Sequence, residues 1–233
     1  MQENKHNIDQ FSRFKALIST CQFEKINNSN ILLIGVGGVG SFVFEALVRS
    51  GFSNITIVDY DTIDITNLNR QIMTTLNNIG SKKVDVLEER ALSINKDIKI
   101  TKNDSFITKN NIDSLNISKY DYIIDCCDTV ETKKEIIKNC LEKKIKFITC
   151  MGTANKFEPN KFEIIDIRKT SYDPLAKKLR KWINDEKIKG KVLCCSSTEK
   201  PIKNKEDYLG STSFVPPAAG LLIASYIVKD IIK

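Results

Sequence analysis

Glycines at a fixed spacing follow a run of apolar residues near the start of the sequence. The segment ILLIGVGGVGSFVFEALVRSG, residues 31–51, places Gly35, Gly37 and Gly40 in a G-x-G-x-x-G pattern between a predicted strand and a predicted helix. Glycines at these positions allow a tight turn and let the backbone approach a pyrophosphate closely. The segment therefore predicts a nucleotide site, although this pattern alone is weak evidence for any one nucleotide.

A carboxylate stands where the ribose of a nucleotide is usually held. Asp59 ends the second predicted strand, 19 residues after Gly40, and an acidic residue at about that distance accepts a hydrogen bond from a ribose hydroxyl. NAD and ATP fit these features about equally well. Glycines that serve only the packing of a strand against a helix are a less favoured alternative.

Polar side chains beyond Asp59 separate the two nucleotides. The segment DYDTIDITNLNRQ, residues 59–71, contains Asn67 and Arg70, and Lys83 follows in GSKK. A triphosphate uses such groups, because arginine offers two parallel donors, lysine a mobile charge and asparagine a neutral donor. A dehydrogenase has no need of them just past its ribose carboxylate. We therefore expect ATP.

Two further carboxylates, Asp125 and Asp128, lie in the segment DCCDTVETK at the end of another predicted strand. The carboxyl ends of parallel strands form the ligand-binding edge of an open α/β sheet. A carboxylate at that edge can hold Mg²⁺ beside phosphate groups. Asp128 is the better placed to reach a metal ion, whereas Asp125 could cap the turn that follows it.

The inventory of reactive side chains excludes several mechanisms. The only histidine, His6, precedes the first predicted element, which removes Ser-His-Asp and Cys-His catalysis and histidine-built metal sites. The seven cysteines contain no Cys-x-x-Cys pair, so we expect neither a structural zinc site nor a disulfide framework. Buried free thiols in a reducing compartment are the expected state.

The net charge of +7 is concentrated in one segment. Residues 168–205 contain 12 Lys and Arg against 4 Asp and Glu, a local charge of +8, whereas the rest of the chain has 24 against 25, or −1. Trp182 and Tyr172 are interleaved with these charges. A solvated lysine-rich face is the plain explanation, but the concentration favours contact with an anionic polymer such as RNA. The basic residues that cluster on one predicted helix are Lys177, Lys178, Arg180 and Lys181.

Short apolar runs alternate regularly with helical patterns. This alternation, with almost fully apolar strands, predicts an α/β fold with a Rossmann-like, mainly parallel sheet and helices on both faces. The predicted strands are residues 31–35, 54–59, 98–102, 120–125, 146–150 and 192–197. The predicted helices are residues 39–50, 81–94, 130–143, 173–186 and 218–232. The last is interrupted by Lys229 and Asp230, so we expect a core or dimer helix, no membrane span and a cytoplasmic protein.

The pattern changes after Gly152. Residues 1–152 carry all the nucleotide motifs, and we expect them to form the ATP-binding core. Residues 153–233 contain an FEIIDI run, the basic segment and the apolar last helix. A chain of 233 residues can bury one substantial core. We therefore expect residues 153–233 to be a smaller basic extension of the same domain, used for RNA binding and dimer contacts.

Four separated motifs occur in an order that resembles a known superfamily. GVGGVGS, DYDTIDITNLNRQ, GSKKVDV and DCCDTVETK resemble, between about Gln10 and Gly152, the ThiF/MoeB/HesA adenylating enzymes related to ubiquitin activators. The resemblance implies ATP and Mg²⁺ as cofactors, with the metal on Asp128. The ATP-binding residues that it implies are Gly35, Gly37, Gly38, Gly40, Asp59, Asp61, Asn67, Arg70, Gln71, Lys83 and Asp128.

The resemblance also implies an arginine that acts between subunits. Arg13, in QFSRFKALI, matches an arginine that crosses the dimer interface in this superfamily to reach the partner's ATP. A homodimer follows from that match. The alternative from the residues themselves is an exposed charge on an amphipathic first helix. The implied catalytic set is Arg13, Asn67, Arg70, Lys83 and Asp128.

The second half of the chain resembles one branch of the superfamily. IDIRKTSYDPLAKKLRKW and LGSTSFVPPAAGLLIAS are similar to segments of the tRNA threonylcarbamoyladenosine dehydratases, and the run from Lys169 to Arg180 discriminates best. Members that activate ubiquitin-like sulfur carriers usually bear two Cys-x-x-Cys zinc pairs, which are absent here. Cys194 and Cys195 replace an expected Val/Tyr/Ser strand, so their roles stay open, with core packing the simpler explanation.

The branch implies an ATP-dependent dehydration of threonylcarbamoyladenosine next to the tRNA anticodon. The threonyl carboxylate is adenylated with release of pyrophosphate, and the neighbouring carbamoyl group then closes a ring and expels AMP. No enzyme nucleophile is needed, because the substrate supplies its own at close range. The resemblance is also compatible with a partner from a sulfur-transfer system, such as a cysteine desulfurase.

Three alternatives stay open at this point. An adenylyltransferase for the C-terminus of a ubiquitin-like sulfur-carrier protein is disfavoured by the missing zinc cysteines. An NAD-dependent oxidoreductase is disfavoured by the Asn, Arg and Lys cluster. A non-catalytic adaptor that binds a nucleotide or a sulfur-transfer protein is disfavoured by the intact set of Arg70, Lys83 and Asp128.

Overall fold

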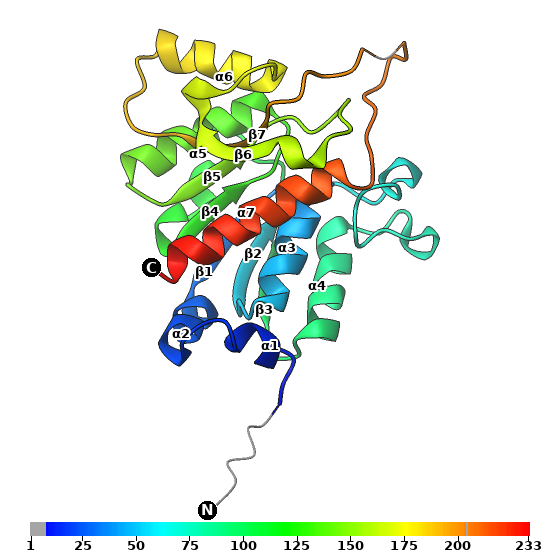
Figure 1. The fold of residues 1–233 in the computed structure, drawn as a ribbon, viewed down its shortest axis with the longest axis vertical. Helices are drawn as coiled ribbons and strands as arrows, with labels where there is room; N and C mark the ends of the chain where they lie inside the picture. Colours follow the sequence, from blue (N-terminus) through cyan, green and yellow to red (C-terminus); the bar gives the residue numbers. More distant parts are fainter. Residues whose placement is uncertain (1–7, 204) are drawn as a thin grey trace, which may run out of the picture.

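Seven strands form one sheet through the middle of the computed structural model, which describes residues 8–203 and 205–233 (Figure 1). Their order is β3-β2-β1-β4-β5-β7-β6, and every neighbouring pair is parallel except the antiparallel β6 and β7. The strands are β1 Asn30–Ile34, β2 Asn54–Val58, β3 Lys99–Asn103, β4 Tyr122–Asp125, β5 Phe147–Cys150, β6 Phe162–Asp166 and β7 Leu193–Ser197. His6 lies outside the described residues.

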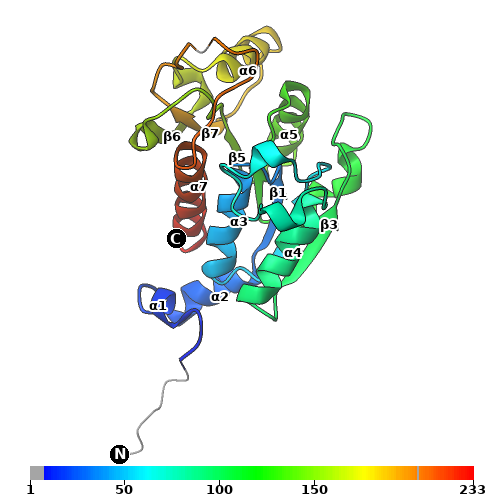
Figure 2. The ribbon, with the colours of Figure 1, turned by 90° about the vertical axis from the view of Figure 1, so that its right-hand side faces the viewer.

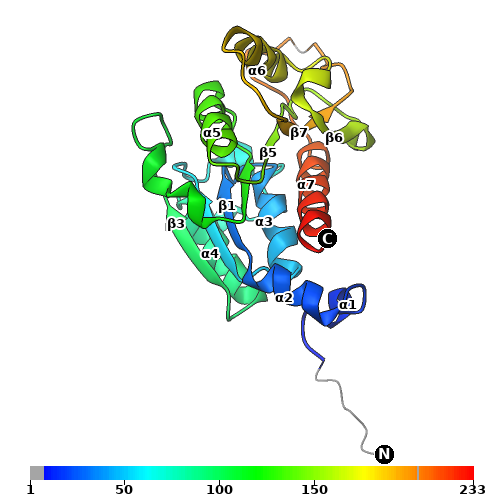
Figure 3. The ribbon, with the colours of Figure 1, turned by 90° about the vertical axis from the view of Figure 1, so that its left-hand side faces the viewer.

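Helices cover both faces of the sheet. They are α1 Ser12–Lys15, α2 Thr20–Asn28, α3 Gly40–Arg49, α4 Lys83–Ile94, α5 Val130–Glu142, α6 Pro174–Asp185 and α7 Val215–Ile231, with short 3-10 turns in several loops. Core residues of α2, α3, α4 and α7 pack together on one face. Those of α5 and α6 pack on the other. Figures 2 and 3 accordingly show α7 beside α3, with α5 across the sheet from them.

The two-residue repeat of a strand sends alternate side chains of β1 into two separate cores. Ile31 and Leu33 belong to the core under α3 and α7, whereas Leu32 and Ile34 belong to the core under α5. All four side chains are nearly or fully buried. Burial on both faces explains why the central strands are continuously apolar in the sequence, and it confirms the predicted mainly parallel sheet.

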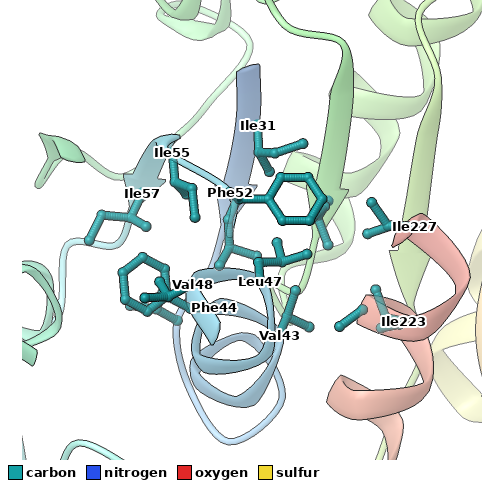
Figure 4. Packing of buried hydrophobic residues seen from close by; sticks show 14 of the residues in the cluster. Ile31, Val43, Phe44, Leu47, Val48, Phe52, Ile55, Ile57, Ile223 and Ile227 are labelled. Atoms are coloured by element: carbon teal, nitrogen blue, oxygen red, sulfur yellow. The ribbon is translucent and has the colours of Figure 1, made fainter. Parts of the chain in front are cut away.

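Helix α7 is a core helix that packs closely on α3. A Cβ atom at Gly220 would lie 2.6 Å from the carbonyl oxygen of Val39, so only glycine permits this approach. Ile223 and Ile227 then extend towards Val43 and the rest of the α3 core (Figure 4). Among the described residues, no helix combines the length and the apolar character that a membrane crossing requires.

The second half of the chain adds strands to the same sheet. β7 pairs with β5 in parallel, through Thr149 with Cys194 and Cys150 with Cys195, and β6 then pairs antiparallel at the edge. The predicted FEIIDI segment is thus an edge strand. Every strand and helix predicted from the sequence is present within a few residues of its expected bounds. The helix expected around Arg13 is only the four-residue α1.

The two ends of the sheet carry different elements. α1 and α2 lead into the amino-terminal end of β1, and they lie at one end of the molecule in Figure 1. α6 lies at the opposite end, beyond the carboxyl ends of the parallel strands. Ligands of open α/β sheets bind outside the carboxyl ends of the strands, so the site is sought there.

Candidate functional site

A cavity of about 660 Å³ lies at the carboxyl ends of the parallel strands, within the roughly 300–1,000 Å³ that is usual for small-molecule sites. It is lined from the strand ends and from the loops that follow them. The structure brings together in this cavity most of the predicted nucleotide residues: Gly35, Gly37, Gly38, Asp59, Asp61, Asn67, Arg70, Gln71, Lys83 and Asp128. Gly40 and Arg13 are not among the lining residues.

The glycine turn between β1 and α3 is shaped by close backbone contacts. Gly35 has a φ of +83°, and a Cβ atom there would lie 2.7 Å from the backbone nitrogen of Cys127. Gly40 packs against the turn itself, so its part is structural. Gly37 differs, because a Cβ atom there would have only the Gln71 amide nitrogen nearby, at 3.7 Å. Gly37 therefore leaves open space towards the cavity.

Asp59 holds the glycine turn in place while lining the cavity. One carboxylate oxygen accepts a hydrogen bond from the Val36 backbone N–H at 2.7 Å, and the other accepts one from the Asp61 N–H at 2.9 Å. Burial raises the pKa of the Asp59 carboxyl, and the nearby Lys83 ammonium opposes that rise. Two backbone donors and a cation thus fix a buried carboxylate where the ribose was predicted to bind.

Lys83 begins α4 with a buried ammonium group directed at the same carboxylates. Its Nζ lies 2.6 Å from Asp61 Oδ2 and 4.0 Å from Asp59 Oδ1. The Lys83 side chain is only 5% exposed, whereas that of Asp61 is 45% exposed. The more exposed partner can turn away into solvent, which would free the lysine to meet a phosphate group.

Asn67, Arg70 and Gln71 come from one short turn. Asn67 ends the 3-10 turn Ile65–Asn67, where its side-chain oxygen accepts a hydrogen bond from the Asp64 N–H at 3.2 Å. The Arg70 guanidinium donates to the Thr66 carbonyl at 2.8 Å and to Asn69 Oδ1 at 2.9 Å. These contacts hold a partly solvated cation at the cavity wall. Gln71 is 5% exposed, beside Gly37.

The two carboxylates after β4 have different surroundings. Asp125 is fully buried, accepts a hydrogen bond from the Cys127 N–H at 3.1 Å, and lies 3.0 Å from the Lys133 ammonium, which also donates to Thr149 at 2.9 Å. Burial works against the charge on Lys133, but the Asp125 carboxylate more than offsets it and raises the lysine pKa. Asp125 therefore caps the turn, and Asp128 is the exposed carboxylate at the cavity.

An aromatic pair that the sequence did not single out borders the nucleotide half of the cavity. Tyr60 and Phe106 meet edge to face, with ring centroids 4.9 Å apart, and both line the cavity while 56% and 43% exposed. Partly exposed rings of this kind can pack against a nucleobase. Tyr60 lies inside the quoted motif, but nothing in the sequence pairs it with Phe106, which follows β3.

A second half of the cavity was also missed. It is formed by the loop after β5, by the first turn of α6 and by the segment that precedes α7. The lining residues there include Gly152, Lys156, Asp173 and Gly210, together with Lys178, which was predicted from the sequence only as an RNA contact. The position of Gly152 just after a predicted strand was the only sequence signal for this half of the cavity. The other segments that line it are distant in the sequence and come together only in the tertiary fold.

Arg13 lies far from the cavity of its own chain. It is exposed on α1, at the end of the molecule opposite α6 in Figure 1. A role at the cavity would therefore require a second copy of the chain.

The basic helix α6 presents three of its four predicted cations to solvent. Lys177, Lys178 and Lys181 are exposed, whereas Arg180 is half-buried and donates a hydrogen bond to the Thr170 hydroxyl. Trp182 is 9% exposed and packs in the core under α6. Trp182 is therefore not available to stack on RNA, because its helical position faces the core, whereas Tyr172 is 61% exposed.

Cys194 and Cys195 are buried in β7, next to β5. Burial raises the pKa of the Cys194 thiol, and contact with Cys150 together with burial raises that of Cys195. Thiols in this state are poor nucleophiles. All seven cysteines of the chain are free.

Comparisons with known proteins agree with this geometry. The ThiF family model matches residues 11–233. The tRNA threonylcarbamoyladenosine dehydratase of Bacillus subtilis is 38% identical over 97% of this chain and 96% of its own length. The crystal structure of the Escherichia coli tRNA N6-threonylcarbamoyladenosine dehydratase TcdA in complex with AMP superposes with a TM-score of 0.91, at 33% identity over 96% of this chain and 94% of that one.

The same Escherichia coli enzyme in complex with ATP superposes with a TM-score of 0.90, at 32% identity over 96% of this chain and 93% of that one. These matches extend through β6, α6 and α7, the part of the chain that the nucleotide motifs do not reach. The chain therefore belongs to the ThiF family and, within it, to the tRNA threonylcarbamoyladenosine dehydratase family.

Proposed function

We propose that this protein dehydrates threonylcarbamoyladenosine in tRNA at the expense of ATP. The observation that carries the proposal is the gathering of the predicted ATP residues in one cavity, in a chain that matches dehydratases almost end to end. The threonyl carboxylate attacks the α-phosphorus of ATP and pyrophosphate leaves. The neighbouring carbamoyl group then attacks the acyl carbon, a ring closes, and AMP leaves with the oxygen that the carboxylate has lost.

The chain's own residues bind and orient ATP in this proposal. Asp59 accepts a hydrogen bond from the ribose, and Gly37 lets the backbone approach the phosphates. Arg70 and Lys83 neutralise the charge that grows on the phosphate oxygens as pyrophosphate leaves, and Asn67 donates a hydrogen bond to them. Stabilising this charge is the main catalytic task in such a transfer. Lys83 gives up its contact with Asp61 (2.6 Å) when it binds a phosphate oxygen.

Asp128 fits a magnesium ion that is bound together with phosphates. Within residues 8–203 and 205–233, no group of three or more His, Cys, Asp and Glu side chains is placed to hold a metal ion. Mg²⁺ commonly takes one or two carboxylates and completes its octahedron with substrate phosphates and water. When bound, it supplies Lewis-acid activation of the phosphate. The chain's contribution is the exposed Asp128 carboxylate on the cavity wall.

No nucleophilic side chain is needed, because the carbamoyl group is already attached beside the activated carboxylate. Holding two reacting groups in this way can contribute about 7–11 kcal/mol. The buried, high-pKa thiols of β7 therefore have no assigned role in the reaction.

The proposal includes a homodimer in which Arg13 reaches the partner's ATP, since Arg13 lies away from the cavity of its own chain. It includes tRNA contact along α6, which lines the cavity through Pro174, Leu175 and the exposed Lys178. A tRNA substrate and free cysteines both fit the cytoplasm. The protein partner included in the proposal is a component of a cysteine desulfurase system.

The experiment that tests the proposal is AMP formation from ATP with three acceptors. tRNA that bears threonylcarbamoyladenosine should give AMP and pyrophosphate in equal amounts. The same tRNA with unmodified adenosine, and a ubiquitin-like sulfur-carrier protein, should give neither. Pyrophosphate release only with the carrier protein, with AMP retained as the acyl-adenylate, would overturn the proposal in favour of an adenylyltransferase.

A further inference from the structure

Two buried charged side chains in the second half of the cavity each have a charged atom that makes no hydrogen bond with the described residues. Lys156 follows β5 and Asp173 precedes α6, and each is only 2% exposed. Lys156 Nζ and Asp173 Oδ2 lie 3.9 Å apart, too far for a hydrogen bond. Among the described residues, neither atom has any hydrogen-bond partner. Both residues line the cavity.

A fully buried ion pair elsewhere in the described part of the chain, Lys133 with Asp125, shows what a structural pair looks like. Lys133 donates to Asp125 at 3.0 Å and to Thr149 at 2.9 Å, and Asp125 also accepts from the Cys127 N–H. A buried charge without such partners destabilises the fold. Burial lowers the pKa of Lys156, and Asp173 opposes that effect only in part. Burial of the Lys156–Asp173 pair therefore destabilises the fold, whereas hydrogen bonds offset that effect for the Asp125–Lys133 pair.

One carboxylate oxygen of Asp173 accepts a hydrogen bond from the backbone, and the other accepts none from the described residues. Asp173 Oδ1 caps α6 by accepting a hydrogen bond from the Ala176 N–H at 2.7 Å, while Oδ2 is the unpartnered atom. A Cβ atom at Gly152 would lie 2.9 Å from that same Oδ2. A side chain at position 152 would therefore displace Asp173 Oδ2, and glycine at this position leaves the space that the oxygen occupies.

We propose that Lys156 and Asp173 recognise the threonylcarbamoyl group of the substrate. This inference rests on the proposed function. The two side chains offer a donor and an acceptor side by side, 3.9 Å apart. The threonylcarbamoyl group is complementary, because its carbonyl and carboxylate oxygens accept hydrogen bonds while its adjoining N–H groups donate them.

In this arrangement Lys156 donates to an oxygen of the group, and Asp173 Oδ2 accepts from a neighbouring N–H. Unmodified adenosine lacks these groups and leaves both charges unpartnered. A site built to hydrogen-bond a substrate rejects an analogue that lacks the matching groups more strongly than an apolar pocket does. Lys156 follows β5 and Asp59 follows β2, and β1 and β4 lie between these two strands in the sheet. In this proposal the pair therefore selects the tRNA substrate without contributing to ATP binding.

The test compares the affinity of the dimeric enzyme for two tRNAs, in the presence of a non-hydrolysable ATP analogue. One tRNA carries threonylcarbamoyladenosine and the other carries unmodified adenosine. We expect the parent protein to bind the modified tRNA more tightly by about tenfold or more, the effect of one or two charge-assisted hydrogen bonds. In Asp173→Asn and in Lys156→Met this preference should fall to about one, with ATP affinity unchanged.

Two controls separate recognition from stability. Asn at position 173 retains a side-chain oxygen for the α6 cap, so this variant tests recognition even where Lys156→Met fails to fold. Lys161→Met provides a matched change, because Lys161 lies 3.8 Å from Glu158 in an exposed pair and is absent from the cavity lining. It should retain the full preference for modified tRNA.

The outcomes distinguish the inference from the proposed function. A parent protein that converts the modified nucleoside, together with a folded Asp173→Asn variant that retains the full preference, would overturn the recognition role and leave the function standing. A parent protein that neither prefers nor converts the modified tRNA would overturn the function, and the inference would fall with it.

Discussion

Gly40, the first residue of α3, lies directly against the carbonyl oxygen of Gly35: a Cβ atom at position 40 would be only 1.9 Å from that oxygen. The end of β1 and the start of α3 therefore pack in direct contact at these two glycines. Gly37 lies between them with open space on its cavity side. One short motif thus combines a packing role with the binding role proposed for Gly37.

The first prediction separates those roles. Gly40→Ala should disrupt the turn and lower the thermal unfolding temperature by several degrees, because backbone atoms must move. Gly37→Ala should fold like the parent, since its nearest neighbour would be 3.7 Å away, yet it should weaken ATP binding by about tenfold or more through loss of close backbone approach. Calorimetric titration with ATP and thermal denaturation check both. Undiminished ATP affinity in Gly37→Ala would contradict the assignment.

The fold was predictable because its signals are local. The apolar runs of β1, β2 and β4, the helix patterns of α3 and α4 and the glycine motif each lie within one stretch of sequence. The convergence of Asp59, Lys83 and their neighbours on one cavity was predictable for the same reason, since these residues follow those strands closely.

The rest of the site depends on contacts between distant segments. Lys156 and Asp173 are 17 residues apart in the sequence and meet only because β5 and α6 converge on the cavity. The burial of Trp182 was also not predicted, because a basic segment that contains an aromatic residue resembles an RNA-binding surface. Only the orientation of α6 shows which of its side chains face the core. Periodicity places Trp182 on the same face as Leu179 and Ile183, both buried, which was the available clue.

A second prediction concerns the stability of the α3–α4 contact. Glu45 is 6% exposed, and it accepts hydrogen bonds from Arg90 at 2.7 and 2.9 Å and from Arg49 at 2.7 Å. Both arginines are partly solvated. Glu45→Gln should therefore lower the free energy of unfolding by about 1–2 kcal/mol at pH 7. Glu89→Gln, an exposed change on α4 next to Arg90, should change it by less than about 0.5 kcal/mol.

The Glu45 effect should depend on pH in one direction. Burial disfavours the carboxylate, but the hydrogen bonds from Arg90 and Arg49 outweigh it and lower the Glu45 pKa below 4.5. The stabilisation is therefore present above pH 4.5 and is lost as the pH falls through the lowered pKa. Denaturant unfolding at several pH values should show the gap between parent and Glu45→Gln closing in acid. A gap that widens in acid would refute this assignment.

A third prediction concerns tRNA contact along α6. Changing Lys177, Lys178 and Lys181 to Ala should weaken tRNA binding and flatten its salt dependence, by a log–log slope of up to ~0.9 for each lost phosphate contact on duplex regions. Arg180 is left in place because it braces Thr170. The matched control replaces Lys25, Lys96 and Lys99, which are exposed near the amino-terminal ends of the strands. Equal salt slopes in the two triple variants would place the tRNA elsewhere.

A fourth prediction concerns action between subunits. Arg13→Ala and Asp128→Ala should each abolish most AMP formation. A heterodimer of the two variants contains one cavity with both Asp128 and the partner's Arg13 intact, so it should recover up to about half of the parent activity. Heterodimers purified through two different affinity tags provide the measurement. Verified heterodimers that stay inactive would show that Arg13 does not act in trans.

The most direct measurement of the central claim is mass spectrometry of nucleosides from tRNA incubated with the protein and ATP. Threonylcarbamoyladenosine should be replaced by a product lighter by one water molecule, in an amount equal to the AMP released. Omitting ATP, or replacing it with NAD, should leave the nucleoside unchanged. An unaltered nucleoside in the presence of ATP and Mg²⁺, from a protein shown to bind ATP, would contradict the account.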